Sequence, residues 1–158
     1  MALLEIKNLT YHYPDTEEPA LSRIDLSIKE GEFVVVAGGS GSGKSSLARA
    51  IAGLIPDFYG GRIGGSIKLE GRELKEINRA KLAQKIGIVF QDPENQLIMT
   101  NVEQELVFGM ENLGLPHARM KKAVMEMSGA LSLYPFLKSN ITQLSGGLKQ
   151  KVALASVL

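Results

Sequence analysis

The sequence contains no cysteine among its 158 residues, and its formal net charge is only +1. Without cysteine the chain can form no disulfide, no catalytic thiolate and no cysteine-ligated zinc site, and it is compatible with a cytosolic location. A near-neutral charge, with no cluster of lysine and arginine interleaved with aromatic residues, disfavours nucleic acid as the main partner. The chemistry must therefore be sought in other residue types.

Long apolar segments are missing as well. No stretch approaches the ~20 apolar residues that a helix needs to cross a bilayer. Residues 1–7 have neither the basic start nor the long apolar run of a signal peptide, so none is expected. A connection to a membrane is therefore expected to depend on a partner protein.

What is present is typical of a globular α/β domain. Hydrophobic residues make up 44% of the chain and charged residues 22%, which excludes disorder, and the length suits one domain. Residues 3–9, 24–28 and 66–70 alternate between apolar and polar, as half-buried strands do. Residues 33–37 and 86–90 are continuously apolar, which predicts strands buried on both faces.

The later part of the chain has a helical pattern. A short helix is predicted at residues 78–84, and a longer one at residues 102–112. Pro116 suits the first position of the next helix. In that helix an apolar stripe at helical spacing is interpreted as core packing rather than as a docking surface. The stripe comprises Met120, Val124, Met127 and Leu131.

The most informative segment is a phosphate-binding loop at residues 38–45. It reads Gly-Gly-Ser-Gly-Ser-Gly-Lys-Ser and matches the pattern G-x-x-x-x-G-K-S/T at every fixed position. The predicted strand 33–37 precedes it and a predicted helix at residues 44–55 follows it, which is the setting that the pattern requires. Glycines let several backbone N–H groups approach a phosphate, and the helix N-terminus adds positive field. The loop therefore predicts nucleotide binding.

Individual loop residues have separate expected roles. Gly38, Gly41 and Gly43 stand where a Cβ would collide with the bound nucleotide. Lys44 should reach the β- and γ-phosphates, and the Ser45 hydroxyl should ligate Mg²⁺. The loop alone does not identify a reaction, because kinases, GTPases and motor ATPases share it.

A second motif lies at residues 144–150, Leu-Ser-Gly-Gly-Leu-Lys-Gln, ahead of a helix-like segment. Ser145 is a capping residue, and Gly146 and Gly147 offer bare backbone N–H groups to an anion. Taken alone this is a helix N-cap. At this distance behind a phosphate loop it resembles the LSGGQ signature of ATP-binding cassette (ABC) proteins.

The resemblance covers essentially the whole chain and implies a P-loop NTPase fold, with an antiparallel β-subdomain and a helical subdomain. It divides the chain into an α/β core at residues 1–90, a Q-loop and helical subdomain at 91–145 and a signature helix at 146–158. It implies ATP and Mg²⁺ as cofactors. It also implies a second ABC subunit bound head to tail, a transmembrane partner and a peripheral location at the cytoplasmic face of the membrane.

The resemblance also assigns site residues. Gln91 takes the place of the Q-loop glutamine, which contacts Mg²⁺ and the attacking water. Tyr13 matches the aromatic residue that stacks on adenine, with Tyr11 as its rival. The expected ATP-binding residues, which come from both motifs and the aromatic position, are Tyr13, Gly38, Gly39, Ser40, Gly41, Ser42, Gly43, Lys44, Ser45, Ser46, Ser145, Gly146 and Gly147.

Two shorter strings, residues 53–61 and 89–96, look most like the ATPases of energy-coupling factor importers for metal ions or vitamins. In such a protein, coupling to the membrane subunit would run through residues 91–107. Glu94, Glu103 and Glu105 could pair with arginines of that subunit, or they could form a solvated acidic surface.

The sequence departs from the family in two respects. Leu148 replaces the usual glutamine of the signature, for which a modest effect is expected. The chain also ends at Leu158, before the Walker B aspartate and the catalytic glutamate of the family. By itself it is therefore expected to be marginally stable and not to turn over ATP.

Two alternatives remain open. The chain could be a cassette that binds nucleotide or a partner without hydrolysis. It could also be a P-loop kinase in which residues 86–90 form the Walker B strand and Asp92 reaches Mg²⁺, although this leaves the signature-like segment unexplained.

Overall fold

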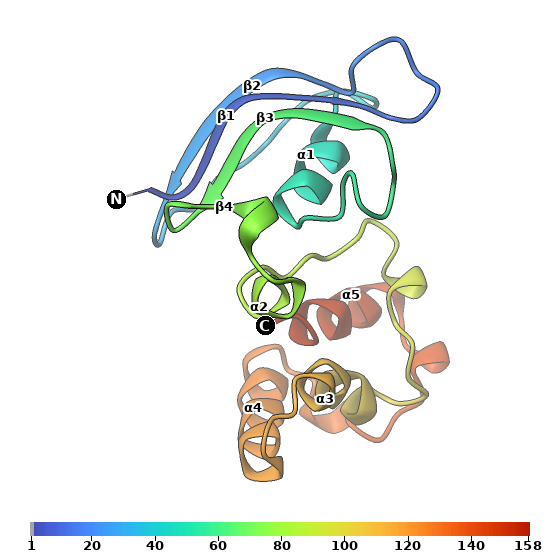
Figure 1. Cartoon of the computed structure of the whole chain (residues 1–158). Coiled ribbons are helices and arrows are strands. Elements are labelled where there is room, and N and C mark those ends of the chain that lie inside the picture. Colours follow the sequence, from blue (N-terminus) through green and yellow to red (C-terminus); the bar gives the residue numbers. More distant parts are fainter. Residues whose placement is uncertain (1) are drawn as a thin grey trace. The chain divides into compact units, whose positions relative to one another are not determined.

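A computed structural model describes residues 2–158. They form two compact units, one ending at Ile86 and the other beginning at Gly87. Figure 1 shows that the first unit contains a sheet and helices, and that the second unit contains a group of helices.

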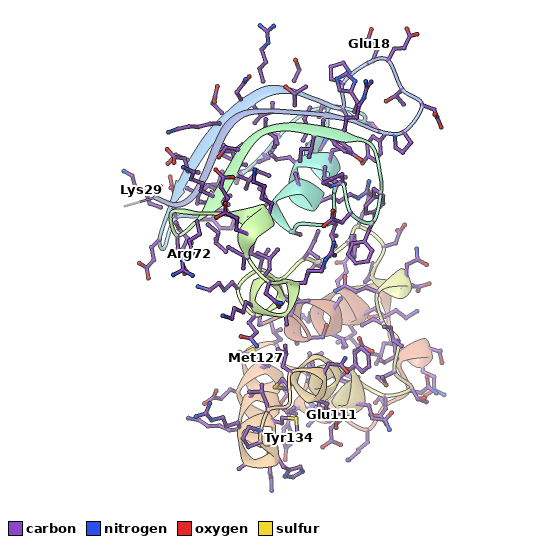
Figure 2. All side chains as sticks on the ribbon, in the orientation of Figure 1. Glu18, Lys29, Arg72, Glu111, Met127 and Tyr134 are labelled. Atoms are coloured by element: carbon purple, nitrogen blue, oxygen red, sulfur yellow. The ribbon has the colours of Figure 1, made fainter. Side chains whose placement is uncertain are left out.

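The first unit contains a four-stranded antiparallel sheet with the strand order β2-β1-β3-β4. Its strands are β1 (Ala2–His12), β2 (Leu21–Lys29), β3 (Arg62–Leu69) and β4 (Arg72–Glu73). The predicted segments 3–9 and 24–28 lie in β1 and β2, and segment 66–70 lies in β3 except for Glu70, which is in the following turn, so all three strands are confirmed. Figure 2 shows Glu18, in the loop between β1 and β2, and Lys29, at the end of β2, at opposite ends of the sheet.

A bulge in β1 keeps its apolar residues on one face. The buried residues are Leu4 and Ile6, then Leu9 and Tyr11, so the two-residue period slips once between them. The register shifts at this point, and Asn8 has a φ of +47°. The extra residue of a bulge restores the alternation, and Leu9 and Tyr11 return to the core face.

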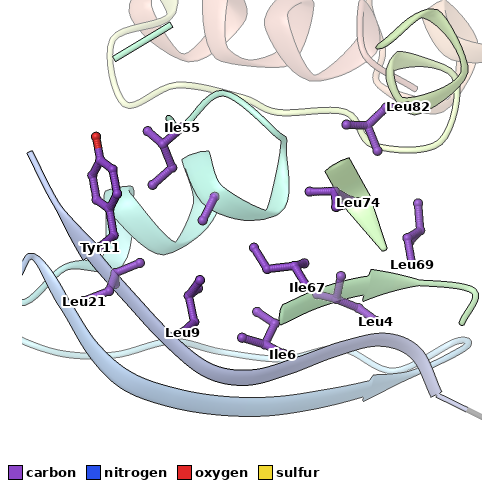
Figure 3. Close-up of a cluster of buried hydrophobic side chains, with 11 residues drawn as sticks. Leu4, Ile6, Leu9, Tyr11, Leu21, Ile55, Ile67, Leu69, Leu74 and Leu82 are labelled. Carbon is purple, nitrogen blue, oxygen red and sulfur yellow. The ribbon is translucent and has the colours of Figure 1, made fainter. Parts of the chain in front are cut away.

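Helix α1 (Lys44–Ile51) lies against the concave face of this sheet (Figure 1). Figure 3 shows Ile6, Leu9 and Ile67 pointing from the strands toward the helix. The short helix α2 (Arg79–Ala83) adds Leu82 to the same core. Each buried leucine or isoleucine contributes about 1.5–3 kcal/mol, so α1 is held in place by the sheet that it covers.

The two segments predicted to be doubly buried strands are not strands. Residues 33–37 have no regular secondary structure, and the side chain of Phe33 is 91% exposed. Residues 86–90 are likewise irregular, with Val89 and Phe90 exposed. Their composition suits burial on both faces, but a strand also needs neighbours for its N–H and C=O groups. Within residues 2–158 neither segment pairs with another strand.

The second unit is helical. It contains α3 (Val102–Asn112), α4 (His117–Ala130) and α5 (Gly146–Ala155). A short turn joins α3 to α4, and a longer connection with the 3-10 helices η3 (Tyr134–Phe136) and η4 (Ile141–Gln143) joins α4 to α5. A third 3-10 helix, η2 (Pro93–Asn95), precedes α3. Pro116 is the N-cap of α4 rather than its first residue. The apolar core of this unit is formed by Val102, Leu106, Val124, Leu133, Ile141, Leu144, Val152 and Ala155.

Three of the four residues in the methionine-bearing stripe of α4 pack as predicted. Val124 is buried in the core of the second unit, and Met127 and Leu131 pack against that core. Met127 is labelled on α4 in Figure 2. The interpretation as core is therefore confirmed for these three residues, whereas Met120 is half-buried and lies outside that core.

Candidate functional site

The phosphate-binding loop runs directly into α1. Gly43 is the N-cap of this helix and has a φ of +88° and a ψ of 0°, a left-handed conformation that glycine adopts without strain. A Cβ at this position would lie 2.5 Å from the carbonyl oxygen of Ala20. Gly41 also has a positive φ, +79°. The loop can therefore take this shape only with glycine at residue 43.

Lys44 folds back over the loop. Its Nζ donates to the carbonyl oxygens of Gly38 at 2.9 Å and Gly39 at 2.6 Å, and lies 3.2 Å from Ser42 Oγ. Lys44 forms no ion pair with the residues that the structure describes. Its ammonium group is thus held at the loop by neutral oxygens. Phosphate oxygens can replace them because, being charged, they are stronger hydrogen-bond acceptors.

The first turn of α1 supplies the remaining polar groups. The first intrahelical hydrogen bond at this end is donated by Leu47 N–H to the Gly43 carbonyl, at 2.8 Å. The N–H groups of Lys44, Ser45 and Ser46 precede it, as orphan donors at a helix N-terminus do. Ser45 is exposed, and its hydroxyl is an oxygen ligand of the kind that Mg²⁺ accepts. These groups fit a phosphate with its metal ion.

The structure distinguishes the two candidate tyrosines. Tyr11 is fully buried, and its hydroxyl donates to the Gly60 carbonyl at 2.7 Å. Burial raises the pKa of Tyr11, and the nearby Tyr13 raises it further. Tyr13 is only half-buried. Of the pair, only Tyr13 keeps exposed surface.

Ser46 contributes differently from its neighbours. Its side chain is buried, and its Oγ lies 3.1 Å from the Tyr13 hydroxyl. The side chain therefore joins the helix to Tyr13, whereas the backbone N–H remains at the helix N-terminus. Tyr13, the loop and the first turn of α1 thus all belong to the first unit.

Gln91, the predicted Q-loop residue, is exposed in the second unit. The segment before it is fixed by Gln96, which the sequence reading missed. Gln96 Oε1 accepts from Phe90 N at 2.9 Å, and its Nε2 donates to the Ile88 carbonyl at 3.3 Å. A side-chain amide can both donate and accept, so Gln96 satisfies two backbone groups as a neighbouring strand would. No local pattern in the sequence signals this role.

The signature segment opens α5 as predicted. Ser145 is its N-cap, and its hydroxyl accepts from Leu148 N at 3.4 Å. Gly146 and Gly147 are exposed, and a Cβ on either would meet no atom within 4 Å. Leu148 is half-buried and packs against the core of the second unit. The leucine that replaces the usual glutamine therefore has a packing role in this chain.

The three glutamates considered for partner contacts already have partners in the chain. Glu94 pairs with Lys149, and Glu103 pairs with Lys138. The carboxylate of Glu105 is buried and accepts from the backbone N–H groups of Ile98 at 2.9 Å and Met99 at 2.7 Å. Glu105 is thus a structural cap of the loop before α3, not a free surface charge.

Residues 21–158 match the family model described as ABC transporter. The chain belongs to the ABC transporter family. Its fold is accordingly that of an ABC ATPase cassette, a P-loop NTPase, and the resemblance drawn from the two motifs is confirmed. This membership sets aside the P-loop kinase and its Asp92.

Two solved structures of the family are similar to this ABC chain. One is cbiO1 from Clostridium perfringens, described as part of the ABC transporter complex cbiONQ, with a TM-score of 0.84 and 33% identity. That match covers 99% of this chain and 61% of cbiO1. The other is the ATP-binding cassette MJ0796, as a dimer bound to ADP and Pi, with a TM-score of 0.81 and 30% identity. It covers 98% of this chain and 68% of that one.

Curated ABC relatives are similar over nearly all of this chain. It is 40% identical to an energy-coupling factor transporter ATP-binding protein, EcfA, from Syntrophomonas wolfei, covering 99% of this chain and 56% of that protein. It is also 40% identical to a putative ABC transporter ATP-binding protein from Methanosarcina acetivorans, covering 99% of this chain. This chain spans 24% of that relative's length.

Proposed function

We propose that this chain binds Mg-ATP at residues 38–46 and serves as an ATP-binding subunit of an ABC importer. The observation that carries the proposal is the loop itself, with a left-handed Gly43 as helix cap and the Lys44 ammonium drawn onto the Gly38 and Gly39 carbonyls. This arrangement places the Lys44 ammonium and the N-terminus of α1 at the same loop, which suits a polyphosphate.

Each part of ATP then has a partner. The phosphates take the N–H groups of the loop and the ammonium of Lys44, and adenine lies on the half-buried ring of Tyr13. Ser45 and Gln91 are the proposed ligands of Mg²⁺, which would neutralise phosphate charge and orient the terminal phosphate. Gln91 is also the proposed catalytic contact to the attacking water.

A second cassette would complete the site. Ser145, Gly146 and Gly147 offer an exposed helix N-terminus, which suits the γ-phosphate of ATP held by another subunit. The dimeric state of MJ0796 supports a head-to-tail pair for this chain. The second cassette can be another copy of this chain, giving a homodimer, or a homologous subunit, giving a heterodimer.

The importer role rests on the relatives. The similarity to an energy-coupling factor transporter ATP-binding protein and to cbiO1, part of an ABC transporter complex, supports a transporter partner. The resemblance of residues 53–61 and 89–96 to importer ATPases leads us to propose a metal ion or vitamin as cargo. Within residues 2–158 no helix is both long and apolar enough to traverse a bilayer. From the similarity to these transporter subunits we propose peripheral attachment at the cytoplasmic face through a transmembrane subunit, with residues 91–107 as the contact region.

The proposed pairing predicts a dimer that depends on ATP. Sedimentation velocity should show Mg-ATP shifting the chain from monomer to dimer. Gly146→Asp should prevent the shift without loss of ATP binding, because its carboxylate would face the γ-phosphate of the other subunit. Gly129→Asp, on an exposed part of α4, introduces the same charge and should still dimerise. A Gly146→Asp protein that dimerises like the wild type would contradict the assignment of the signature.

A further inference from the structure

Arg49 lies in the second turn of α1 and contacts two aromatic side chains. Its Nη1 donates to the Tyr13 hydroxyl at 2.9 Å, and its guanidinium lies 4.5 Å from the centroid of the Tyr59 ring. The hydrogen bond with Tyr13 is the main reason why the pKa of Arg49 is raised, so its charge is fixed. Within the described residues it forms no salt bridge. Its polar contact is the hydrogen bond to the phenol hydroxyl of Tyr13.

Ser46, one turn before Arg49 in α1, also contacts the Tyr13 hydroxyl. Ser46 and Arg49 are three residues apart on α1 and therefore share a face of the helix. The Tyr13 oxygen accepts from Arg49 and also lies 3.1 Å from Ser46 Oγ, a hydrogen bond in which either hydroxyl can donate. The far end of the Tyr13 side chain is thus fixed by two groups of the helix that follows the phosphate loop.

The ring of Tyr13 is held as well. Tyr11 packs against it edge to face, with 4.8 Å between ring centroids and 73° between ring planes. Tyr11 is itself fully buried and anchored to Gly60. Tyr13 therefore connects β1 to α1 with little freedom, and the orientation of its ring is set by Arg49, Ser46 and Tyr11 together.

We propose that Arg49 is a positioning residue for the adenine of bound ATP. By holding the Tyr13 hydroxyl, it keeps the tyrosine ring at a fixed place relative to the helix whose first turn holds the phosphates. A ring ordered before the ligand arrives loses less conformational freedom on binding. The inference rests on the proposed function, because it assumes that ATP lies between Tyr13 and the loop.

The test compares ATP with tripolyphosphate, which has the phosphates without the base. Mg²⁺-dependent binding of both is measured by calorimetry for the wild type and Arg49→Met. We expect the affinity for ATP to fall about fivefold, corresponding to one side chain that must be ordered on binding. The affinity for tripolyphosphate should not change. Arg49→Lys should recover part of the ATP affinity, because an ammonium can still donate to the phenol.

Two further proteins make the result specific to this contact. Tyr13→Phe removes only the hydroxyl, and combining it with Arg49→Met should weaken ATP binding no more than Arg49→Met alone. Arg72→Met removes an exposed arginine of the same unit (Figure 2) and should bind both ligands like the wild type.

The possible outcomes are distinct. Equal losses for ATP and tripolyphosphate would mean that Arg49 supports the loop or the fold in general, and would overturn the inference. Unchanged affinity for both ligands would overturn it as well. A wild-type chain that binds tripolyphosphate and ATP equally would show that no base contact exists. A wild-type chain that binds neither would contradict the proposed function itself.

Discussion

Replacing Gly43 by alanine is expected to abolish measurable binding of Mg-ATP. The residue caps α1 at a φ of +88°, and the new Cβ would lie 2.5 Å from the Ala20 carbonyl oxygen. The loop must then move, and its N–H groups no longer converge on the phosphates. Losing two charge-assisted hydrogen bonds corresponds to a decrease of about a hundredfold or more in affinity. Calorimetry with Mg-ATP measures it.

The control separates backbone strain from the steric clash. Gly71 has a similar φ of +79°, but a Cβ there would meet no atom within 4 Å. It also lies between β3 and β4, outside the proposed site. Gly71→Ala should therefore lower stability slightly while ATP binds normally. A Gly43→Ala protein that binds ATP as tightly as Gly71→Ala would show that the loop tolerates a side chain.

The second large effect concerns stability. Gly65→Ala is expected to lower the free energy of unfolding by about 2–4 kcal/mol. Gly65 lies opposite the bulge of β1 with a φ of +92°, and its Cβ would be 2.4 Å from the Asn8 carbonyl oxygen. Because this contact is with backbone, a side chain there must separate β3 from β1. Urea denaturation, followed by circular dichroism, measures the change.

The adjacent glycine provides the control. Gly64 is in the same strand, but a Cβ there would have no neighbour within 4 Å. Gly64→Ala should therefore change the free energy of unfolding by less than about 0.5 kcal/mol. If the two alanine variants were equally stable, the close approach of the strands at the bulge would be wrong.

Local patterns predicted the elements that are stabilised by their own residues. The helix expected at residues 102–112 is observed as Val102–Asn112, and Ser145 caps α5 as the motif indicated. Both depend on spacing or capping within one turn, which the sequence displays directly. The strand predicted at residues 33–37 is not formed, for the opposite reason. Its apolar run suits a buried strand, but hydrogen-bonded neighbours are not encoded locally.

The same distinction applies to the site. The phosphate loop and the signature segment could be recognised from the sequence because each motif consists of consecutive residues. The choice between Tyr11 and Tyr13 needed the burial of each ring, which depends on how β1 packs on α1. The contact of Arg49 with Tyr13 joins residues 36 positions apart, and a lone arginine in a helix gives no sign of it. Such long-range contacts can be identified only once the fold is known.

The central claim, that ATP binds at the phosphate loop, is tested most directly by hydrogen exchange with and without Mg-ATP. The amides of residues 38–46 should exchange more slowly when ATP is bound, because they donate to phosphate oxygens. Lys44→Ala should lose this protection. Wild-type protein with unchanged exchange at residues 38–46 under saturating Mg-ATP, or with protection that survives in Lys44→Ala, would contradict the account.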